Sequence, residues 1–196
     1  EPLEQGFVRL THDGLTTLLP GKVSVIGTTN PCPCGWLGDP RNQCMCTPAE
    51  IARYQRRISG PLLDRIDMVI EVSRVPFDEP GSLERIEATN GVTLDAIRSR
   101  IHDTRQLQRA RNGDGELNGF QRWDLVEALG KLPPASRRLV ARIGDRYALT
   151  GRGLVRLLRV ARTIADLAGS ESIETIHVAE AAAYRLPPEY GPAHQG

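Results

Sequence analysis

Four cysteines confined to 15 residues constrain the fold of this chain more than any other feature of its sequence. They form two Cys-x-Cys pairs, Cys32 with Cys34 and Cys44 with Cys46, separated by nine residues. The surrounding loop also contains prolines and glycines that interrupt helices and strands, so we expect it to need a cross-link to adopt one conformation. Two pairs of thiolates on a short loop can supply the four ligands of a tetrahedral ion, as in structural zinc sites.

Three interpretations of the cysteines differ in what holds the loop together. We favour a structural zinc ion bound by all four thiolates. The alternatives are reduced cysteines that pack without a metal, and disulfides, which are the least favoured because a disulfide framework usually spreads its cysteines along the chain. A catalytic zinc ion is not expected, because four cysteine ligands leave no open position for water.

Overall composition restricts the class of protein. The chain has 196 residues, 40% of them hydrophobic, and a formal net charge of +1, which excludes a strongly basic tail and an acidic disordered chain. No run approaches the roughly 18 apolar residues of a membrane span, and no secretory signal is recognisable. We therefore expect a globular cytoplasmic protein with no membrane partner. The first residue, Glu1, is not methionine, which suggests that the chain begins within a longer protein.

The first 80 residues have the pattern of an α/β domain. Two short runs over 7–11 and 15–19 enclose an Asp-Gly pair, which predicts a β-hairpin. Residues 47–58 begin with Thr-Pro and have a Glu three positions after the Thr, the signature of a capped helix. Apolar, largely β-branched runs over 23–28 and 68–72 predict buried strands on either side of this helix, so we expect strands of a parallel sheet.

The second half of the chain is predicted to be helical. A stretch rich in acidic residues, Pro and Gly near residue 80 ends the α/β pattern, and no β pattern follows it. We expect an α/β part over 1–80, a linker over 81–92, an all-α domain over 93–186 and a disordered tail over 187–196. The predicted helices lie near residues 93–111, 121–130, 135–147, 151–168 and 174–185.

Arginines are concentrated in one part of this helical region. Eight of them lie between residues 137 and 162, against a single acid, Asp145. Arg152, Arg156 and Arg159 share one face of the helix predicted over 151–168. Charged helix faces are most often simply solvated, which is the alternative to a binding surface. As a binding surface, the region would suit polyanions, either nucleotide phosphates or a nucleic-acid backbone.

Asn30 and Arg65 are candidate site residues whose residue types alone do not decide their role. Asn30 follows the strand predicted over 23–28 and precedes a proline, so a turn-forming role is the alternative to a catalytic one. Arg65 lies between Asp64 and Asp67, so a local ion pair is the alternative there. No Ser/His/Asp or Cys/His arrangement typical of a nucleophilic enzyme stands out.

Several segments together resemble the magnesium-chelatase-like AAA+ ATPases of the ComM/YifB type, over positions 1 to about 186. The resemblance implies the C-terminal part of an AAA+ P-loop NTPase core, with a β-hairpin insertion and a Cys-rich loop, followed by an all-α lid domain. The segments that carry it are residues 30–35 (NPCPCG), 38–40 (GDP), 44–48 (CMCTP), Tyr54, 59–67 (SGPLLDRID) and 158–167 (LRVARTIADL).

The resemblance also implies roles for individual residues. Asn30 matches the sensor-1 residue, which orients the attacking water near the γ-phosphate. Arg65 matches the arginine finger, which reaches the ATP of a neighbouring subunit and stabilises the charge of the transition state. Arg152 matches the sensor-2 arginine at the start of a lid helix, and Arg156 is a second candidate in the same region.

The motifs that would hold the phosphates and the magnesium ion of ATP are missing from these 196 residues. No G-x-x-x-x-G-K-[ST] sequence occurs, and no apolar strand ends in a pair of acids. We therefore expect ATP and Mg²⁺ to need residues upstream of this chain, and the chain alone to be inactive.

The function implied by the resemblance is that of a motor acting on DNA. We expect the C-terminal part of a homo-oligomeric, hexameric ATPase that hydrolyses ATP at subunit interfaces, in helicase or branch-migration activity during natural transformation. One alternative is an ATPase subunit of magnesium chelatase, against which the cysteine loop argues. The other is a non-enzymatic, zinc-stapled module that binds nucleic acid or a protein, which the missing phosphate loop favours for the isolated chain.

Overall fold

The computed structural model describes residues 5–39, 41–58, 60–72, 93–113 and 115–185. The predicted boundary near residue 80, the linker over 81–92 and the tail over 187–196 lie outside the described residues. The chain falls into two compact units, Glu1–Ile66 and Asp67–Gly196. None of the helices formed by the described residues combines the length and the apolar composition needed to cross a membrane.

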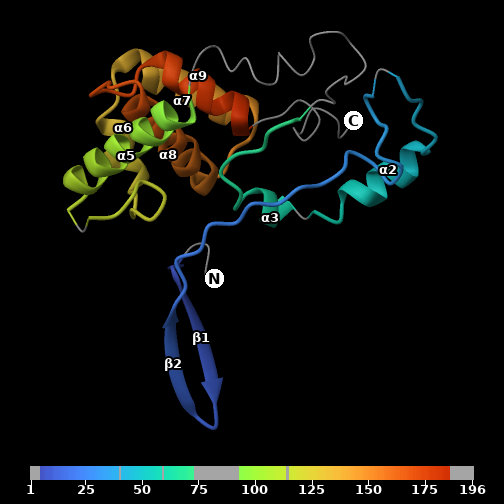
Figure 1. Ribbon diagram of the computed structural model, residues 1–196, viewed down its shortest axis with the longest axis horizontal. Helices are drawn as coiled ribbons and strands as arrows, with labels where there is room; N and C mark the ends of the chain where they lie inside the picture. Colours follow the sequence, from blue (N-terminus) through green and yellow to red (C-terminus); the bar gives the residue numbers. More distant parts are fainter. Residues whose placement is uncertain (1–4, 40, 59, 73–92, 114, 186–196) are drawn as a thin grey trace. The chain divides into compact units, whose positions relative to one another are not determined.

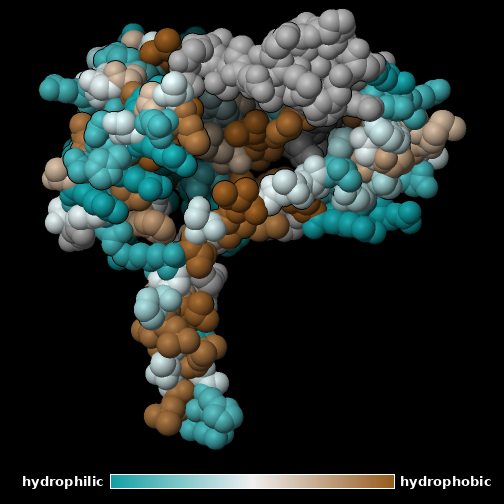
Figure 2. All heavy atoms as spheres, in the orientation of Figure 1, coloured by the Kyte–Doolittle hydropathy of each residue, from teal (hydrophilic) through white to brown (hydrophobic). Residues whose placement is uncertain are grey.

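The first unit begins with a two-stranded antiparallel hairpin (Figure 1), made of β1 (Phe7–His12) and β2 (Leu15–Pro20). Asp13 and Gly14 form its turn with φ angles of 47° and 79°. Two consecutive positive φ angles are typical of the tight turns whose twist matches that of the flanking strands, which is why Asp-Gly is favoured there. The hairpin predicted from this pair is confirmed. Apolar side chains gather along it (Figure 2), and Leu10, Leu15 and Leu18 are exposed.

The two strands predicted over 23–28 and 68–72 are not formed, so the prediction of parallel sheet strands is wrong for this structure. Residues 21–30 and 66–72 have no regular secondary structure, and Ile26 and Ile70 are 94% and 62% exposed. A strand needs a neighbouring strand to pair its N–H and C=O groups. In the described part of the chain the hairpin is the only sheet, so neither segment has such a neighbour. The described residues therefore form a mixed α/β chain, with one two-stranded sheet and several helices.

Helix α2 (Pro48–Gln55) confirms the predicted capped helix, and the short α3 (Gly60–Leu63) follows it. The Thr47 Oγ1 atom accepts a hydrogen bond from the Glu50 N–H at 3.3 Å, and Glu50 accepts one from the Thr47 N–H at 2.8 Å. These reciprocal bonds satisfy two N–H groups at the helix start. The bonds that the Glu50 carboxylate accepts from the Thr47 N–H and hydroxyl lower the pKa of Glu50. The Gln55 side chain donates to the Pro31 carbonyl at 3.3 Å, which ties α2 to the start of the cysteine loop.

The second unit is helical, as predicted, and α8 lies at its centre (Figure 1). Leu157, Leu158 and Ala161 on α8 are fully buried, together with Val178 and Ala181 on α9. Apolar side chains at helical spacing along α8 therefore form part of the core of this unit. Its helices are α5 (Leu94–Arg111), α6 (Leu125–Gly130), α7 (Pro134–Arg146), α8 (Gly151–Leu167) and α9 (Thr175–Arg185).

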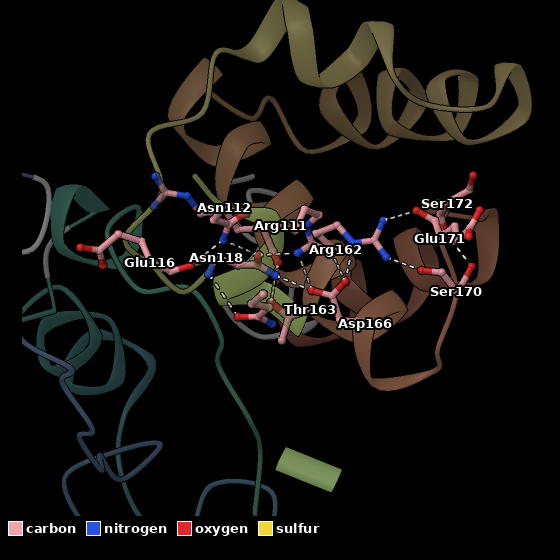
Figure 3. A network of polar contacts seen from close by, with 12 residues as sticks. Arg111, Asn112, Glu116, Asn118, Arg162, Thr163, Asp166, Ser170, Glu171 and Ser172 are labelled. Carbon is pink, nitrogen blue, oxygen red and sulfur yellow. Dashed lines mark hydrogen bonds and ion pairs between the residues drawn. The ribbon is translucent and has the colours of Figure 1, made fainter. Parts of the chain in front are cut away.

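A buried polar network joins α5 to α8 (Figure 3). Asp166 is its centre, with a side chain that is 0% exposed. Its carboxylate accepts hydrogen bonds from Arg111 at 2.8 Å, from Asn118 at 2.9 Å and from Arg162 at 2.9 Å. The other end of the Arg162 guanidinium donates to the carbonyls of Ser170 and Glu171, beyond the end of α8.

Two of the eight arginines between residues 137 and 162 are not part of an exposed basic surface. Arg156 and Arg162 are buried in ion pairs with Asp67 and Asp166, so these two side chains do not lie on a solvated helix face. For Arg162 the reason is local, because Asp166 follows it by four residues and lies on the same side of the helix.

Replacement of Asp166 by Asn is expected to destabilise the second unit by about 3–5 kcal/mol, because two arginines would then lose a buried counterion. Burial alone would raise the pKa of Asp166, but hydrogen bonds from Arg111 and Asn118 and the charge of Arg162 hold it below its ordinary value. The stabilisation is therefore present above pH of about 4, the unfolded pKa, and is lost as the pH falls below it.

Urea unfolding of the wild type and the variant, followed by circular dichroism from pH 7 to 3, measures this effect. The difference in unfolding free energy is expected to shrink at the acidic end. Asp95→Asn, at an exposed position of α5, is the control and should change little. An equal loss of stability in both variants would contradict a special role for the buried carboxylate.

Candidate functional site

The four cysteines predicted as metal ligands lie together in the structure. Their Sγ atoms are all within 4.8 Å of one another. The Cys32 Sγ atom lies 3.4 Å from that of Cys34 and 3.7 Å from that of Cys44, and the Cys34 and Cys44 Sγ atoms are 3.6 Å apart. A disulfide requires a separation of about 2.05 Å, and all four cysteines are free. The disulfide alternative is therefore not present in this structure.

The sulfur separations match those of a tetrahedral metal site. Zinc–sulfur bonds of about 2.3 Å in a tetrahedron place the sulfur atoms about 3.8 Å apart. The three measured separations, 3.4 to 3.7 Å, lie slightly inside this value. The four sulfur atoms and their spacing therefore suit a cation bound by four thiolates, with no position left for a catalytic water molecule.

Local backbone turns bring the two cysteine pairs together. Gly35 and Gly38 have φ angles of 83° and 80°, which residues with a Cβ rarely adopt, and the Gly35 N–H donates to the Cys32 carbonyl at 3.1 Å. Asp39 then accepts hydrogen bonds from the N–H groups of Arg41 and Asn42, each at 2.8 Å. These turns fold the chain back toward the second cysteine pair.

The cysteines differ in how readily they ionise. A hydrogen bond from the Trp36 backbone lowers the pKa of Cys34 to about 6, so its thiolate forms at neutral pH. A backbone hydrogen bond from Cys34 favours the Cys46 thiolate, but burial and the neighbouring Cys34 and Cys44 sulfurs outweigh it and raise the pKa of Cys46 to about 12. Several thiolates in one place repel each other, and a divalent cation would offset that repulsion.

Asn30 and Arg65, the predicted catalytic residues, both belong to the first unit. Asn30 is exposed at the end of the irregular segment 21–30, directly before the loop that holds the cysteines. Arg65 is half-buried in the turn after α3, where its N–H donates to the Leu62 carbonyl at 2.9 Å. The catalytic roles of both residues remain predictions.

Arg152 and Arg156, the predicted nucleotide-contacting residues, lie one turn apart on α8 but in different surroundings. Thr150 caps the helix through a 3.0 Å hydrogen bond from the Gly153 N–H, and Arg152 is exposed in the first turn. The Arg156 side chain is 8% exposed, and its NH1 atom lies 2.7 Å from the Asp67 Oδ1 atom. Arg152 is therefore the more exposed of the two side chains.

Sequence reasoning did not assign a role to Asp67, Arg111, Asn118 or Asp166. Only the pairing of Arg162 with Asp166 had a local signal, their four-residue spacing on one helix. Arg111 is 55 residues from Asp166, and Asp67 is 89 residues from Arg156, so no local pattern indicates these pairs.

Two family models match consecutive parts of the chain. The model described as magnesium chelatase, subunit ChlI, matches residues 1–79, and the model of the ChlI C-terminal part matches residues 91–185. Together they cover both units of the structure.

Individual relatives align with nearly the whole chain. It is 32% identical over 185 residues to the competence protein ComM of Haemophilus influenzae, and 31% identical over 185 residues to the uncharacterized protein YifB of Escherichia coli. An uncharacterized protein of Mycobacterium tuberculosis is 32% identical over 186 residues. Each alignment covers 94% of this chain and 35% of the relative, so the chain spans about a third of the length of these relatives. The chain therefore belongs to the magnesium-chelatase-like family that includes ComM and YifB.

Proposed function

We propose that this chain is the sensor-1, arginine-finger and lid portion of an AAA+ ATPase that acts on DNA. The observation that carries the proposal is Arg152, exposed in the first turn of α8 within the part of the chain that matches the ChlI C-terminal model. The N–H groups and the dipole at the start of a helix favour an anion, and an arginine beside them adds a charge that suits a phosphate. A nucleotide phosphate is the anion that the family membership supports.

The proposed chemistry is ATP hydrolysis at the interface between subunits. Asn30 would orient the attacking water, and Arg152 would contact the phosphates from the lid. Arg65 would stabilise the transition state from the neighbouring subunit, which makes assembly of several copies, a hexamer, part of the proposal. The residues that cradle the phosphates and hold Mg²⁺ would come from a part of the whole protein outside these 196 residues.

The cysteine cluster has a structural role in this proposal. A zinc ion bound by Cys32, Cys34, Cys44 and Cys46 would fix the loop that begins directly after Asn30 and Pro31. The Gln55 side chain on α2 donates a hydrogen bond to the Pro31 carbonyl, so the start of the loop is also attached to the helix that follows the loop. Zinc would thus hold the backbone next to the proposed sensor-1 residue in place.

The DNA-acting role rests on the family and not on a contact in this structure. The name competence protein, carried by the Haemophilus influenzae relative, supports a part in natural transformation. The other description in the family, magnesium chelatase, names a different use of the same kind of ATPase.

The whole protein is expected to hydrolyse ATP, with turnover increased by single-stranded or branched DNA, whereas the 196-residue chain alone should bind no nucleotide. A coupled ATPase assay with and without DNA, and titration of the chain with a fluorescent ATP analogue, measure both results. Turnover that DNA leaves unchanged would favour the chelatase alternative. Micromolar nucleotide binding by the chain alone, or a whole protein without turnover, would contradict the proposal.

A further inference from the structure

The segment that directly follows Arg65 is fastened to the helical unit at two points. The Asp67 Oδ1 atom lies 2.7 Å from the Arg156 NH1 atom on α8, and the Val69 N–H donates to the Tyr184 carbonyl on α9 at 2.7 Å. Both contacts lie within the second unit, so they belong to one compact body. The segment 67–69, which has no regular secondary structure, is therefore attached to the helices through the Asp67 side chain and the Val69 backbone N–H.

Loss of the ion pair between Asp67 and Arg156 would leave a buried arginine without its carboxylate partner. Arg156 is 8% exposed, whereas Asp67 is 52% exposed, so the arginine depends on the carboxylate more than the carboxylate depends on the arginine. Arg159 lies nearby, and its pKa is lowered by burial and by the charge of Arg156, an effect that Asp67 opposes. Asp67 is thus the ion-pair partner of Arg156, and its charge also offsets part of the repulsion between Arg156 and Arg159.

The ion pair also connects the two arginines that have catalytic or nucleotide-binding roles in the proposed function, Arg65 and Arg152. Arg152 precedes Arg156 by four residues, so the two lie on one side of α8, about 5–6 Å apart along the helix. Arg65 precedes Asp67 by two residues, which limits the distance between their Cα atoms to about 7 Å. Arg152 and Arg65 are therefore connected by one helical turn, one ion pair and two residues of chain.

We propose that Asp67 and Arg156 are positioning residues that couple the lid arginine Arg152 to the arginine finger Arg65. This inference rests on the proposed function and deepens it. When Arg152 contacts a phosphate, the ion pair passes the resulting shift of α8 to Arg65, which serves the neighbouring subunit. Arg156 then acts through Asp67 and not on the nucleotide.

The test is Asp67→Asn in the whole protein, which keeps the size of the side chain and removes its charge. We expect kcat for ATP to fall about 10- to 100-fold, because small misplacements of a catalytic group have effects of this size. The KM for ATP should change less than about threefold, because no nucleotide contact is removed. Asp95→Asn, at an exposed position on α5, is the matched control and should leave both constants unchanged.

The exchange of the two charges distinguishes coupling from a loss of folding. Asp67→Arg alone should be more impaired than Asp67→Asn, and the double variant Asp67→Arg with Arg156→Asp should recover at least tenfold in kcat over Asp67→Arg. The melting temperature of each variant is measured alongside.

The possible outcomes separate this inference from the proposed function. If the wild type is active and Asp67→Asn has the same kcat, the coupling alone is overturned. The coupling alone is also overturned if Arg156→Gln raises the KM for ATP and leaves kcat unchanged. A double variant that regains its melting temperature but not its kcat also overturns the coupling. A wild type without ATP turnover overturns both the proposed function and the coupling.

Discussion

The protein purified without a chelator is expected to contain about one zinc ion per chain, and Cys32→Ser is expected to lose it. Cys32 is fully buried, and its sulfur lies 3.4 Å and 3.7 Å from those of Cys34 and Cys44, so a hydroxyl in its place removes one of the four ligands of the cluster. Structural zinc contributes about 10–16 kcal/mol of apparent binding free energy in small domains at pH 7. Its loss should therefore unfold the loop over residues 31–47 rather than loosen it.

Mass spectrometry of the bound metal and hydrogen exchange of the loop amides measure this expectation. Met45→Ser is the matched control, because Met45 lies between two of the cysteines but is exposed and supplies no ligand to the cluster. Zinc affinity should fall as the pH is lowered, because the ligands must be thiolates. Metal-free wild type with full protection of the loop amides would leave packed, reduced cysteines as the correct interpretation.

The elements that could be predicted from the sequence are those whose signals are local. The Asp13-Gly14 pair predicted the hairpin because two adjacent residues decide the turn, and Thr47 with Glu50 predicted the start of α2 because a capping box spans only four residues. The helices of the second unit could also be predicted, because each lies within one continuous stretch of the sequence. The cysteine cluster was recognisable because all four ligands lie within one short loop.

The features that could not be predicted depend on partners distant in the sequence. The segments over 23–28 and 68–72 have the composition of buried strands, but a strand also needs a neighbour, and the described residues supply none. The burial of Arg156 depends on Asp67, which lies 89 residues away. A basic residue on a helix looks the same in a sequence whether it faces water or a buried carboxylate, so the interior arginines were read as part of a surface.

Replacement of Arg65 by alanine in the whole protein is expected to lower ATP turnover by about 10³-fold or more while leaving nucleotide binding nearly intact. Arginine fingers supply about 10³ to 10⁵ in kcat, because the guanidinium neutralises charge that develops only in the transition state. The backbone at this position is held by hydrogen bonds from the N–H groups of Arg65 and Ile66 to the Leu62 carbonyl, at 2.9 Å and 3.2 Å. Alanine preserves these backbone bonds.

Steady-state ATPase assays and binding of a fluorescent nucleotide separate the two effects, with Arg53→Ala on the exposed face of α2 as the control. Arg65→Lys should recover little, because an ammonium group cannot reproduce the planar fork of donors. In the proposed assembly each finger serves the next subunit, so Arg65→Ala chains mixed into wild-type assemblies should disable sites that belong to wild-type neighbours. Activity should then depend on which subunits are adjacent, and not on the amount of wild-type chain alone. Turnover that Arg65→Ala leaves unchanged would remove Arg65 from the catalytic assignment, and the ion pair between Asp67 and Arg156 would then have only a structural role.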